Sequence, residues 1–431
     1  MAKTFRPYVP EQELLLPPSL HDWLPDNHLA HFVSDLVDEL NLSAILTPYD
    51  DEERGYPPYH PVMFTKVLLY AYCVGVFSSR KIERRLLEDV AFRVLAAGNA
   101  PDFRTISEFR RRHLDALQGL FTQVLRLARQ AGAVQMGRVA IDGSKVKANA
   151  SKHKAMSYGR MHEREAALEQ EVHHLLTQAD ATDAQEDAQH GRDRRGDDLP
   201  AELQRRTTRL ARIREAKRVL EARAKEAAAA KPEPLADAAK PDDKAQYNFT
   251  DPESRIMKGP EGFVQAYNAQ IAVEATTQLI VGQAVTQEAN DKRQLTPMIE
   301  TVAAQSGDAP HEVLADSGYC SDANLAYTAA HEIEAYIATG GLKHDAPVPP
   351  CRGPLPKNAT LTDRMRRKLR TTRGADVYRW RKAIVEPVFG QIKHGRGFRQ
   401  FLLRGAQKVR AEWALVCLTH NILKCYGLIC A

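Results

Sequence analysis

The sequence lacks the segments that direct a protein into a membrane or out of the cell. Its longest apolar stretch, residues 62–77, contains Lys66 and is shorter than the roughly 20 residues that a membrane-spanning helix needs. The first ten residues contain no apolar run of the kind that a secretory signal carries. These absences predict a cytoplasmic protein without a transmembrane part.

Motifs for several common kinds of catalysis are also absent. The six cysteines include no CxxC pair, which disfavours a zinc ribbon or a thiol-redox site. There is no GxxxxGK phosphate loop, so the sequence indicates no requirement for ATP. The patterns GxGxxG, HExxH and GxSxG are missing as well, which disfavours dinucleotide-dependent enzymes, zinc proteases and serine hydrolases.

Acidic residues are scarce in one part of the chain. Residues 351–410 contain 17 Lys and Arg but only 3 Asp and Glu, although the whole chain has 60 and 55 and a net charge of only +5. A dense block of one sign attracts a polyanion, and nucleic acid is the commonest such partner. A solvated basic surface is the alternative, and an anionic membrane surface is a weaker one.

The first 135 residues predict an all-helical N-terminal domain. Apolar residues recur at helical spacing, and prolines separate the helices. A short basic run at 110–112 fits a DNA-binding domain, although a solvated helix face explains it equally well. The predicted helices are 28–42, 62–76, one through Ile82, Leu86, Val90 and Phe92, and one that opens within 101–112 with Thr105 or Ser107 as its cap.

After residue 135 the pattern becomes that of an α/β domain. Residues 138–148 predict a strand, or a hairpin that turns at Gly143 and Ser144. We expect this domain to cover 136–410 and a C-terminal helix to cover 411–431. Further strands are predicted at 263–273, 279–285, 313–316 and 333–337, with helices between them capped by Asn290 or Asp291 and by Ser321.

A charged, alanine-rich segment, residues 151–245, interrupts this domain. One helix is outlined by Leu168, Val172, Leu175 and Leu176, and a second, at near-heptad spacing, by Leu203, Leu210, Ile213 and Leu220. Together they predict a helical hairpin. Residues 180–198 have the composition of a flexible loop between the two helices. Residues 224–244 predict a frayed helix end and a linker back to the domain.

Two aspartates follow short apolar strands. Asp142 follows residues 139–141 and Asp316 follows residues 313–315, and each precedes a Gly or a Ser-Gly. Ligands and metals gather at the carboxyl ends of strands in α/β sheets. Each aspartate alone could be a strand-end turn residue or a helix cap. As a pair on one predicted sheet, they favour a shared site.

A third acid stands in an apolar frame. Glu386 lies between Ile384-Val385 and Val388-Phe389, so we expect it to be partly buried and therefore paired or metal-bound. Pro387 either begins a helix or kinks one. Lys382 and Lys393 lie four residues before and seven after Glu386, on the same helical face. A salt bridge to one of these lysines is the alternative to a metal-binding role.

Three carboxylates in a basic setting suit a particular chemistry. Magnesium prefers oxygen ligands and is often held by a few carboxylates together with substrate phosphates. Two such ions can promote displacement at a phosphodiester. Glycosidases also use paired carboxylates, but a sugar site gives no reason for the basic segment around Glu386.

At these positions the chain resembles bacterial insertion-sequence transposases, which have a DDE active site on an RNase H-like core. AIDGSKVKANASK is similar to the first-Asp motif, LADSGYCSDANL to the second, and YRWRKAIVEPVFGQIK to the third-acid motif. YPPYHPVMF, FSSRKIERR and PDFRTISEFRRR resemble the helical domain that precedes the core in one such group.

The third motif has the family pattern Tyr-x2-Arg-x3-Glu-x6-Lys. Tyr378, Arg381, Glu386 and Lys393 match it in residue type and in the final spacing. Four residues rather than three separate Arg381 from Glu386, and Lys382 stands at the strict spacing. Either cation could therefore take the place of the family's arginine.

The resemblance implies an α/β RNase H-like core, with a mixed sheet flanked by helices, an all-helical N-terminal domain and a helical insertion. It also implies a transposase that cleaves and joins DNA strands at insertion-sequence ends. Asp142, Asp316 and Glu386 would be catalytic and would hold two Mg²⁺ ions, for which Mn²⁺ can substitute. The implied DNA ligands are Tyr378, Arg381, Lys382, Lys393, Lys145, Lys147, Arg396 and Arg399.

The implied partner is double-stranded DNA, both the terminal inverted repeats and the target. A homodimer would assemble on it without ATP, in the bacterial cytoplasm and on the nucleoid when bound. Two other functions remain open: an RNase H-like nuclease that cuts without joining, and a non-catalytic DNA-binding protein derived from a transposase. A third is an interaction protein that works through the insertion, although its short heptads favour dimerisation or DNA grip within the enzyme.

Overall fold

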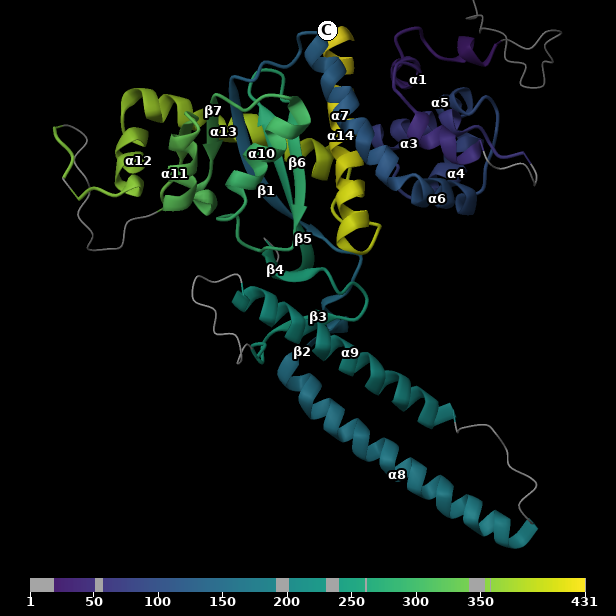
Figure 1. The fold of residues 1–431 in the computed structure, drawn as a ribbon. Helices are drawn as coiled ribbons and strands as arrows, with labels where there is room; N and C mark the ends of the chain where they lie inside the picture. Colours follow the sequence, from purple (N-terminus) through teal and green to yellow (C-terminus); the bar gives the residue numbers. More distant parts are fainter. Residues whose placement is uncertain are drawn as a thin grey trace, which may run out of the picture.

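The structure is a computed structural model that describes residues 19–50, 57–190, 201–229, 240–259, 262–340, 353–356 and 358–430. Figure 1 shows the helices of residues 29–112 on one side, a sheet with its flanking helices in the middle, and a long helical hairpin that projects away from the sheet. Within the described residues, no helix combines the length and the apolar content needed to cross a membrane.

The N-terminal region is helical, as predicted. The expected third helix is two helices, because Asp89 adopts an extended backbone and its carboxylate accepts a hydrogen bond from the amide of Ala91. Asp102 caps the next long helix, so the prediction of Thr105 or Ser107 was wrong. The helices are α1 (Leu29–Asp38), α2 (Ser43–Leu46), α3 (Pro61–Cys73), α4 (Ser79–Glu88), α5 (Val90–Leu95), α6 (Phe103–Arg112) and α7 (Leu114–Gln130).

One of the three arginines in the predicted basic patch of α6 is not at the surface. Arg110 is buried, and its guanidinium donates to the hydroxyl of Tyr72 and the carbonyl of Phe77. It therefore joins α6 to the end of α3. Only Arg111 and Arg112 remain exposed on this helix end.

The central sheet is mixed. Strand β1 (Arg138–Lys147) runs antiparallel to β5 (Gly262–Glu274) and parallel to β7 (Glu312–Ala315), which is parallel to β8 (Glu334–Ile337). The order is β4-β5-β1-β7-β8, and β6 (Ile280–Thr286) pairs with the same edge of β5 as β4 (Arg255–Gly259). The alternative of a hairpin at Gly143 and Ser144 was wrong, because β1 continues through both residues.

Helices cover the sheet. Helix α13 (Thr372–Gly390) packs across β1, β5, β7 and β8, and α10 (Leu295–Ser306) packs against β5 and β6. Helices α11 (Asp322–Ala330) and α12 (Leu361–Leu369) contact β8 and lie beyond β7 in Figure 1. The predicted fold class, an α/β core with a mixed sheet flanked by helices and preceded by helices, is confirmed.

The last helix of the described chain, α14 (Ala406–Cys430), joins the N-terminal helices to the sheet. It contacts α3 and α7 on one side and β6 on the other. Trp413 is fully buried, and its indole nitrogen donates to the carbonyl of Gln270 in β5. The side chain of Asn421 exchanges two hydrogen bonds of 2.8 Å with the backbone of Ile280 in β6.

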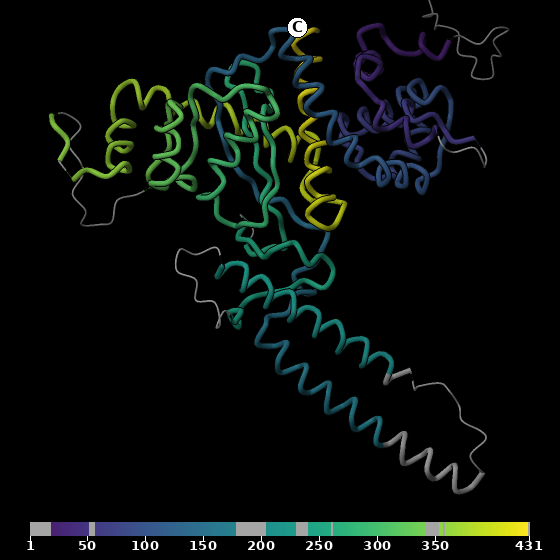
Figure 2. Tube along the Cα trace, in the orientation of Figure 1, coloured from purple at the N-terminus to yellow at the C-terminus, as the bar shows by residue number. Residues whose placement is uncertain are grey.

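The insertion is a helical hairpin, as predicted (Figure 2). Helices α8 (Tyr158–His190) and α9 (Ala201–Ala229) rise from a two-stranded base of β2 (Ala155–Ser157) and β3 (Gln246–Asn248). The hairpin has its own small core, which includes Met161, Leu168, Ile213 and Leu220.

Two expected irregular segments of the insertion differ from their predictions where they are described. Residues 180–190 of the predicted loop are the last part of α8, and residues 191–198 lie outside the described residues. Of the predicted frayed end and linker, residues up to 229 are helical and 230–239 lie outside the described residues.

Candidate active site

The first two acids of the predicted site are neighbours across two parallel strands. Ile141 of β1 pairs with Ala315 of β7, so Asp142 and Asp316 follow at the same level on strands about 4.8 Å apart. The pairing with β7 ends there, whereas β1 continues beside β5 to Lys147. The sheet therefore has one strand fewer beside β1 from Asp142 onward.

Asp142 is held by a cation. Its carboxylate accepts a hydrogen bond of 3.0 Å from the guanidinium of Arg381 in α13, and the two side chains are only 19% and 10% exposed. Burial raises the pKa of Asp142, and the charge of Asp316 raises it further, against the lowering effect of Arg381. The strand ends thus concentrate negative charge that Arg381 partly neutralises.

Asp316 shapes its own loop. Its carboxylate accepts a hydrogen bond of 2.8 Å from the amide of Gly318, as the cap of a short 3-10 turn. A cap was one of the two structural roles that the sequence allowed for this aspartate. This role is compatible with metal binding, because the other carboxylate oxygen stays available. Tyr378 of α13 is half-buried beside the same charges. Burial raises its pKa, Arg381 lowers it, and Asp316 raises it.

Glu386 differs from its prediction. It is exposed, and its carboxylate makes no hydrogen bond or ion pair within the part of the chain that the structure describes. The expected partial burial and the alternative salt bridge to Lys382 or Lys393 were therefore wrong. The reason is helical geometry: α13 turns Ile384, Val385 and Val388 toward the sheet, and a residue next to Val385 points about 100° away.

The helix does not begin at Pro387. Helix α13 starts at Thr372 and runs through the proline to Gly390, and one turn of π-helix, Gln391–Gly395, follows. This wider turn directs Lys393 to β1, where its ammonium donates to the hydroxyl of Ser144 and to the carbonyl of Lys145 at 3.4 Å. Burial lowers the pKa of Lys393.

A further carboxylate, that of Asp291, lies close to Asp142 and Asp316, and its role was not predicted from the sequence. Asp291 was predicted as a possible helix cap, but Gln294 occupies the position before α10. The carboxylate of Asp291 instead accepts hydrogen bonds from the side chains of Asn268 (2.6 Å) and Gln270 (2.7 Å), and Lys145 lies at 3.4 Å.

Two glycines allow this crowding. A Cβ at Gly143 would lie 2.2 Å from the side-chain nitrogen of Gln270 and 2.9 Å from Asp291. A Cβ at Gly318 would lie 2.9 Å from Asp316 and 3.5 Å from Asp291. The glycines that follow the two aspartates in the sequence are therefore a signal of close approach that could have indicated a further polar group.

Tyr319 lies near the same three carboxylates, those of Asp142, Asp291 and Asp316. Its ring is buried, and its hydroxyl donates to the side-chain oxygen of Gln270. Burial raises its pKa well above the ordinary value, and the charges of Asp291, Asp142 and Asp316 raise it further. Three carboxylates thus surround one end of the sheet.

A bound metal ion needs several donor atoms close together. Within the described residues, no three His, Cys, Asp or Glu side chains lie close enough together to hold an ion. The adjacent oxygen donors of Asp142 and Asp316 do fit Mg²⁺, which is often bound by one or two carboxylates together with water and phosphate oxygens. Glu386 would complete the set only if its side chain turned toward them.

A basic cavity lies further along β1, beyond Asp142. It measures about 320 Å³, and Lys145, Lys147, Lys393, His394 and Arg399 line it together with Gly259 and Val264. Four of the predicted DNA ligands thus meet at one place, although they are separated by about 250 residues in the sequence. Lys382 is exposed on α13.

Arg396 does not join them. It is 7% exposed, and its guanidinium donates to the hydroxyl of Thr419 and the carbonyl of Val416 in α14, while burial lowers its pKa to about 10. A Cβ at Gly75 would lie 2.6 Å from the carbonyl oxygen of Arg396, so the end of α3 also packs tightly here. Arg396 therefore stabilises the protein interior. Because its guanidinium is buried, it does not form the predicted contact with DNA in this structure.

Two protein-family models match the sequence. The model described as a transposase domain (DUF772) matches residues 18–112, which include α1 to α6, and the model of a transposase DDE domain matches residues 355–426, which include α12, α13 and most of α14. No curated protein and no solved structure gives a significant match.

A helical transposase domain followed by a DDE domain on a mixed sheet defines a class of DNA-rearranging proteins. The two matches support the identification of the chain as an insertion-sequence DDE transposase, as its motifs predicted. The DDE match contains Glu386 but neither Asp142 nor Asp316. The assignment of these two aspartates rests on their motifs and on their adjacency.

Proposed function

We propose that this transposase cleaves DNA strands at the ends of its insertion sequence and joins the freed ends to target DNA, with Asp142, Asp316 and Glu386 as catalytic carboxylates. The adjacency of Asp142 and Asp316, on a strand that continues into the wall of a basic cavity, supports this most strongly. Two carboxylates at this separation repel each other, so the site favours a bound cation. A polyanionic substrate would find complementary charge further along the same strand.

Glu386 is proposed to join the two aspartates when DNA and metal bind. It shares one side of α13 with Tyr378 and Lys382, which precede it by eight and four residues. Tyr378 lies beside the charges of the aspartates, and Lys393 reaches Ser144 from the next turn. Because Glu386 is exposed and unpaired within the described residues, a change of side-chain rotamer would break no existing contact.

Two magnesium ions, or manganese in their place, would activate the attacking oxygen and stabilise the leaving oxygen of the phosphodiester. The other roles belong to side chains. Arg381 holds the carboxylate of Asp142 in position at 3.0 Å. The cations of the cavity, Lys145, Lys147, Lys393 and Arg399, would bind backbone phosphates and so fix the register of the strand.

Tyr378 and Lys382 complete the proposed contacts with the strand, and Arg381 would add a phosphate contact if DNA binding releases it from Asp142. Arg396 is left out of the set because it is buried. The helical region before residue 135 is proposed to bind the terminal repeat. A homodimer would hold the two ends of the element, since each end needs one site.

The test is cleavage of a labelled duplex that carries one end of the element encoding the chain. Wild type, Glu386→Gln and a control, Glu300→Gln, are incubated with Mg²⁺ or Mn²⁺, or with EDTA. Glu300 is exposed on α10 and lies outside the proposed site. We expect metal-dependent cutting by wild type and by the control, and its loss in Glu386→Gln with DNA binding retained.

Two other outcomes would change the assignment. Binding without cutting in all three proteins would favour a DNA-binding protein that has lost catalysis. Cutting without the appearance of joined strands, when a target plasmid is added, would favour a nuclease that does not transfer strands.

A further inference from the structure

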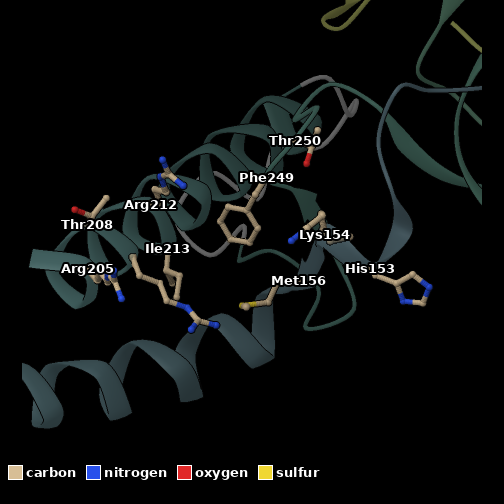
Figure 3. Close-up of a pocket in the computed structure, with 11 residues that line it drawn as sticks. His153, Lys154, Met156, Arg205, Thr208, Arg212, Ile213, Phe249 and Thr250 are labelled. Atoms are coloured by element: carbon tan, nitrogen blue, oxygen red, sulfur yellow. The ribbon is translucent and has the colours of Figure 1, made fainter. Parts of the chain in front are cut away.

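The base of the helical hairpin contains a second basic cavity, whose lining includes none of the three proposed catalytic acids. It measures about 560 Å³, and no Asp or Glu lines it. Its walls come from α9 and from the segments on either side of the β2–β3 base (Figure 3). The basic residues that line it are His153, Lys154, Arg205, Arg209 and Arg212.

These arginines differ from the other cations of the same helix. Arg214 and Lys217 form ion pairs with Glu165 of α8 at 3.1 Å and 2.5 Å, and these pairs bind the two helices together. Arg205, Arg209 and Arg212 are exposed and make no hydrogen bond or ion pair within the described residues. Their charge is therefore not used to hold the hairpin together.

The three arginines lie on one face of α9. Their spacing of four and three residues places them in a row, and seven residues of helix span about 10 Å. A duplex carries one phosphate per roughly 3.4 Å of axis on each strand, so a row of this length meets several phosphates. A single free phosphate would need only one or two of these cations.

The base of the hairpin holds the opposite wall in place. The amide of Phe249 donates to the carbonyl of Lys154 at 3.0 Å, and the side chain of Asn248 donates to the carbonyl of Ser151 at 2.8 Å. Figure 3 shows the ring of Phe249 between Lys154 on one side and Arg212 with Ile213 on the other. The cations thus stand on a fixed frame rather than on the distant tip of the hairpin.

The cavity is connected to the candidate active site by a short length of chain. Strand β1 runs from Asp142 through Lys145 and Lys147, and residues 148–151 lead from it to Lys152 and Lys154 at the hairpin base. Cations recur all along this path. DNA that leaves the first basic cavity could follow them to the second.

We propose that the cavity at the hairpin base binds the sugar–phosphate backbone of duplex DNA outside the cleavage point, so that the insertion acts as a second DNA grip. The proposal rests on the proposed function, because it assumes that DNA occupies the site beside Asp142. It assigns Lys154, Arg205, Arg209 and Arg212 to this contact. The binding is electrostatic and has no sequence preference of its own.

The test measures the salt dependence of DNA binding. Full-length wild type and the triple variant Arg205→Gln/Arg209→Gln/Arg212→Gln are titrated into a labelled 40-base-pair random duplex in EDTA, from 0.05 to 0.3 M NaCl, by fluorescence anisotropy. Each lost phosphate contact reduces the slope of log K against log salt by about 0.9, so we expect a reduction of about 2–3 and a 10- to 100-fold weaker affinity at 0.15 M. The control is Arg218→Gln/Lys225→Gln, which removes two exposed charges from α9 outside the cavity, one of them paired with Glu215.

A slope equal to that of wild type, in a triple variant with an unchanged melting temperature, would overturn the proposal while leaving the proposed function intact. Absence of DNA binding by wild type would instead refute the proposed function. An unchanged slope together with loss of self-association in sedimentation would show that the cavity holds an acidic segment of a second copy, which also overturns the DNA contact.

Discussion

Substitution of Glu386 and substitution of Asp142 should have different effects on the melting temperature. Glu386→Gln and Asp142→Asn are both expected to abolish cleavage. Glu386 is exposed and makes no contact through its carboxylate within the described residues, so its replacement should shift the melting temperature by no more than about 1 °C. Asp142 accepts a hydrogen bond from Arg381, which is only 10% exposed.

The size of the second effect follows from that contact. Removing the charge of Asp142 leaves the guanidinium of Arg381 partly buried without its counter-ion, which costs about 1–3 kcal/mol. Burial raises the pKa of Asp142 and so already disfavours the carboxylate, which offsets part of this loss. For a chain of this size, 1 kcal/mol corresponds to about 2 °C, so we expect a decrease of about 2–6 °C.

The assay is scanning calorimetry or fluorimetry of both variants in EDTA, with Arg381→Gln and the double variant Asp142→Asn/Arg381→Gln completing a mutant cycle. We expect a coupling of about 1 kcal/mol or more between Asp142 and Arg381. A loss of stability in Glu386→Gln as large as in Asp142→Asn would refute the exposed position of Glu386. A more stable Asp142→Asn, with no coupling, would show that the pair costs more in desolvation than its hydrogen bond contributes.

Three further outcomes are expected. Asp291→Asn should slow single-turnover cleavage about 10- to 100-fold with unchanged DNA affinity, because its carboxylate orients groups around the aspartate pair. Arg396→Gln should lower the free energy of unfolding, measured in urea, by about 2–4 kcal/mol, because the carbonyl of Val416 and the hydroxyl of Thr419 lose the hydrogen bonds that Arg396 donates. DNA binding at 25 °C should stay unchanged. Burial raises the pKa of Glu412 to about 7, whereas its pKa in the unfolded chain is near 4.5. Between these two pH values the unfolded state binds fewer protons than the folded state. The free energy of unfolding therefore falls by up to about 3 kcal/mol as the pH rises from about 4.5 to about 7. Urea titrations at pH 5 and pH 8 should show that Glu412→Gln removes this part of the pH dependence.

Periodicity and turn residues were sufficient to predict most elements of the sheet. The strands at 263–273, 279–285 and 333–337 were expected within one or two residues, and Ser321 caps α11 as predicted. In each of these segments the spacing of the apolar residues stays the same from end to end, so every part of the segment predicts the same secondary structure. Strand β4 and the short β2–β3 base were not predicted, because their residues alternate weakly and depend on pairing with distant strands.

The errors at the site have a common physical cause. Apolar neighbours in the sequence suggested that Glu386 is buried, but adjacent residues of a helix point about 100° apart, so an acid between buried residues can face the solvent. A string of basic residues suggested that Arg396 contacts DNA, but composition does not distinguish a surface arginine from one whose donors are all used inside the protein. Asp291 was missed because its partners, Asn268 and Gln270, belong to a strand whose neighbours are set only by the fold.

Helix α14 has a consequence for how the enzyme is made. It is synthesised after every other element described, yet it covers β6, α7 and α3 and contributes the buried Trp413. A nascent chain that has not reached Ala406 therefore exposes the apolar surfaces of both the N-terminal helices and the sheet edge. Arg381 and Lys393 also come late, on the helix just before it. The site and the core therefore assemble only after this part of the chain has been synthesised, and a chain terminated before Ala406 would be an unfinished core rather than a shorter active enzyme.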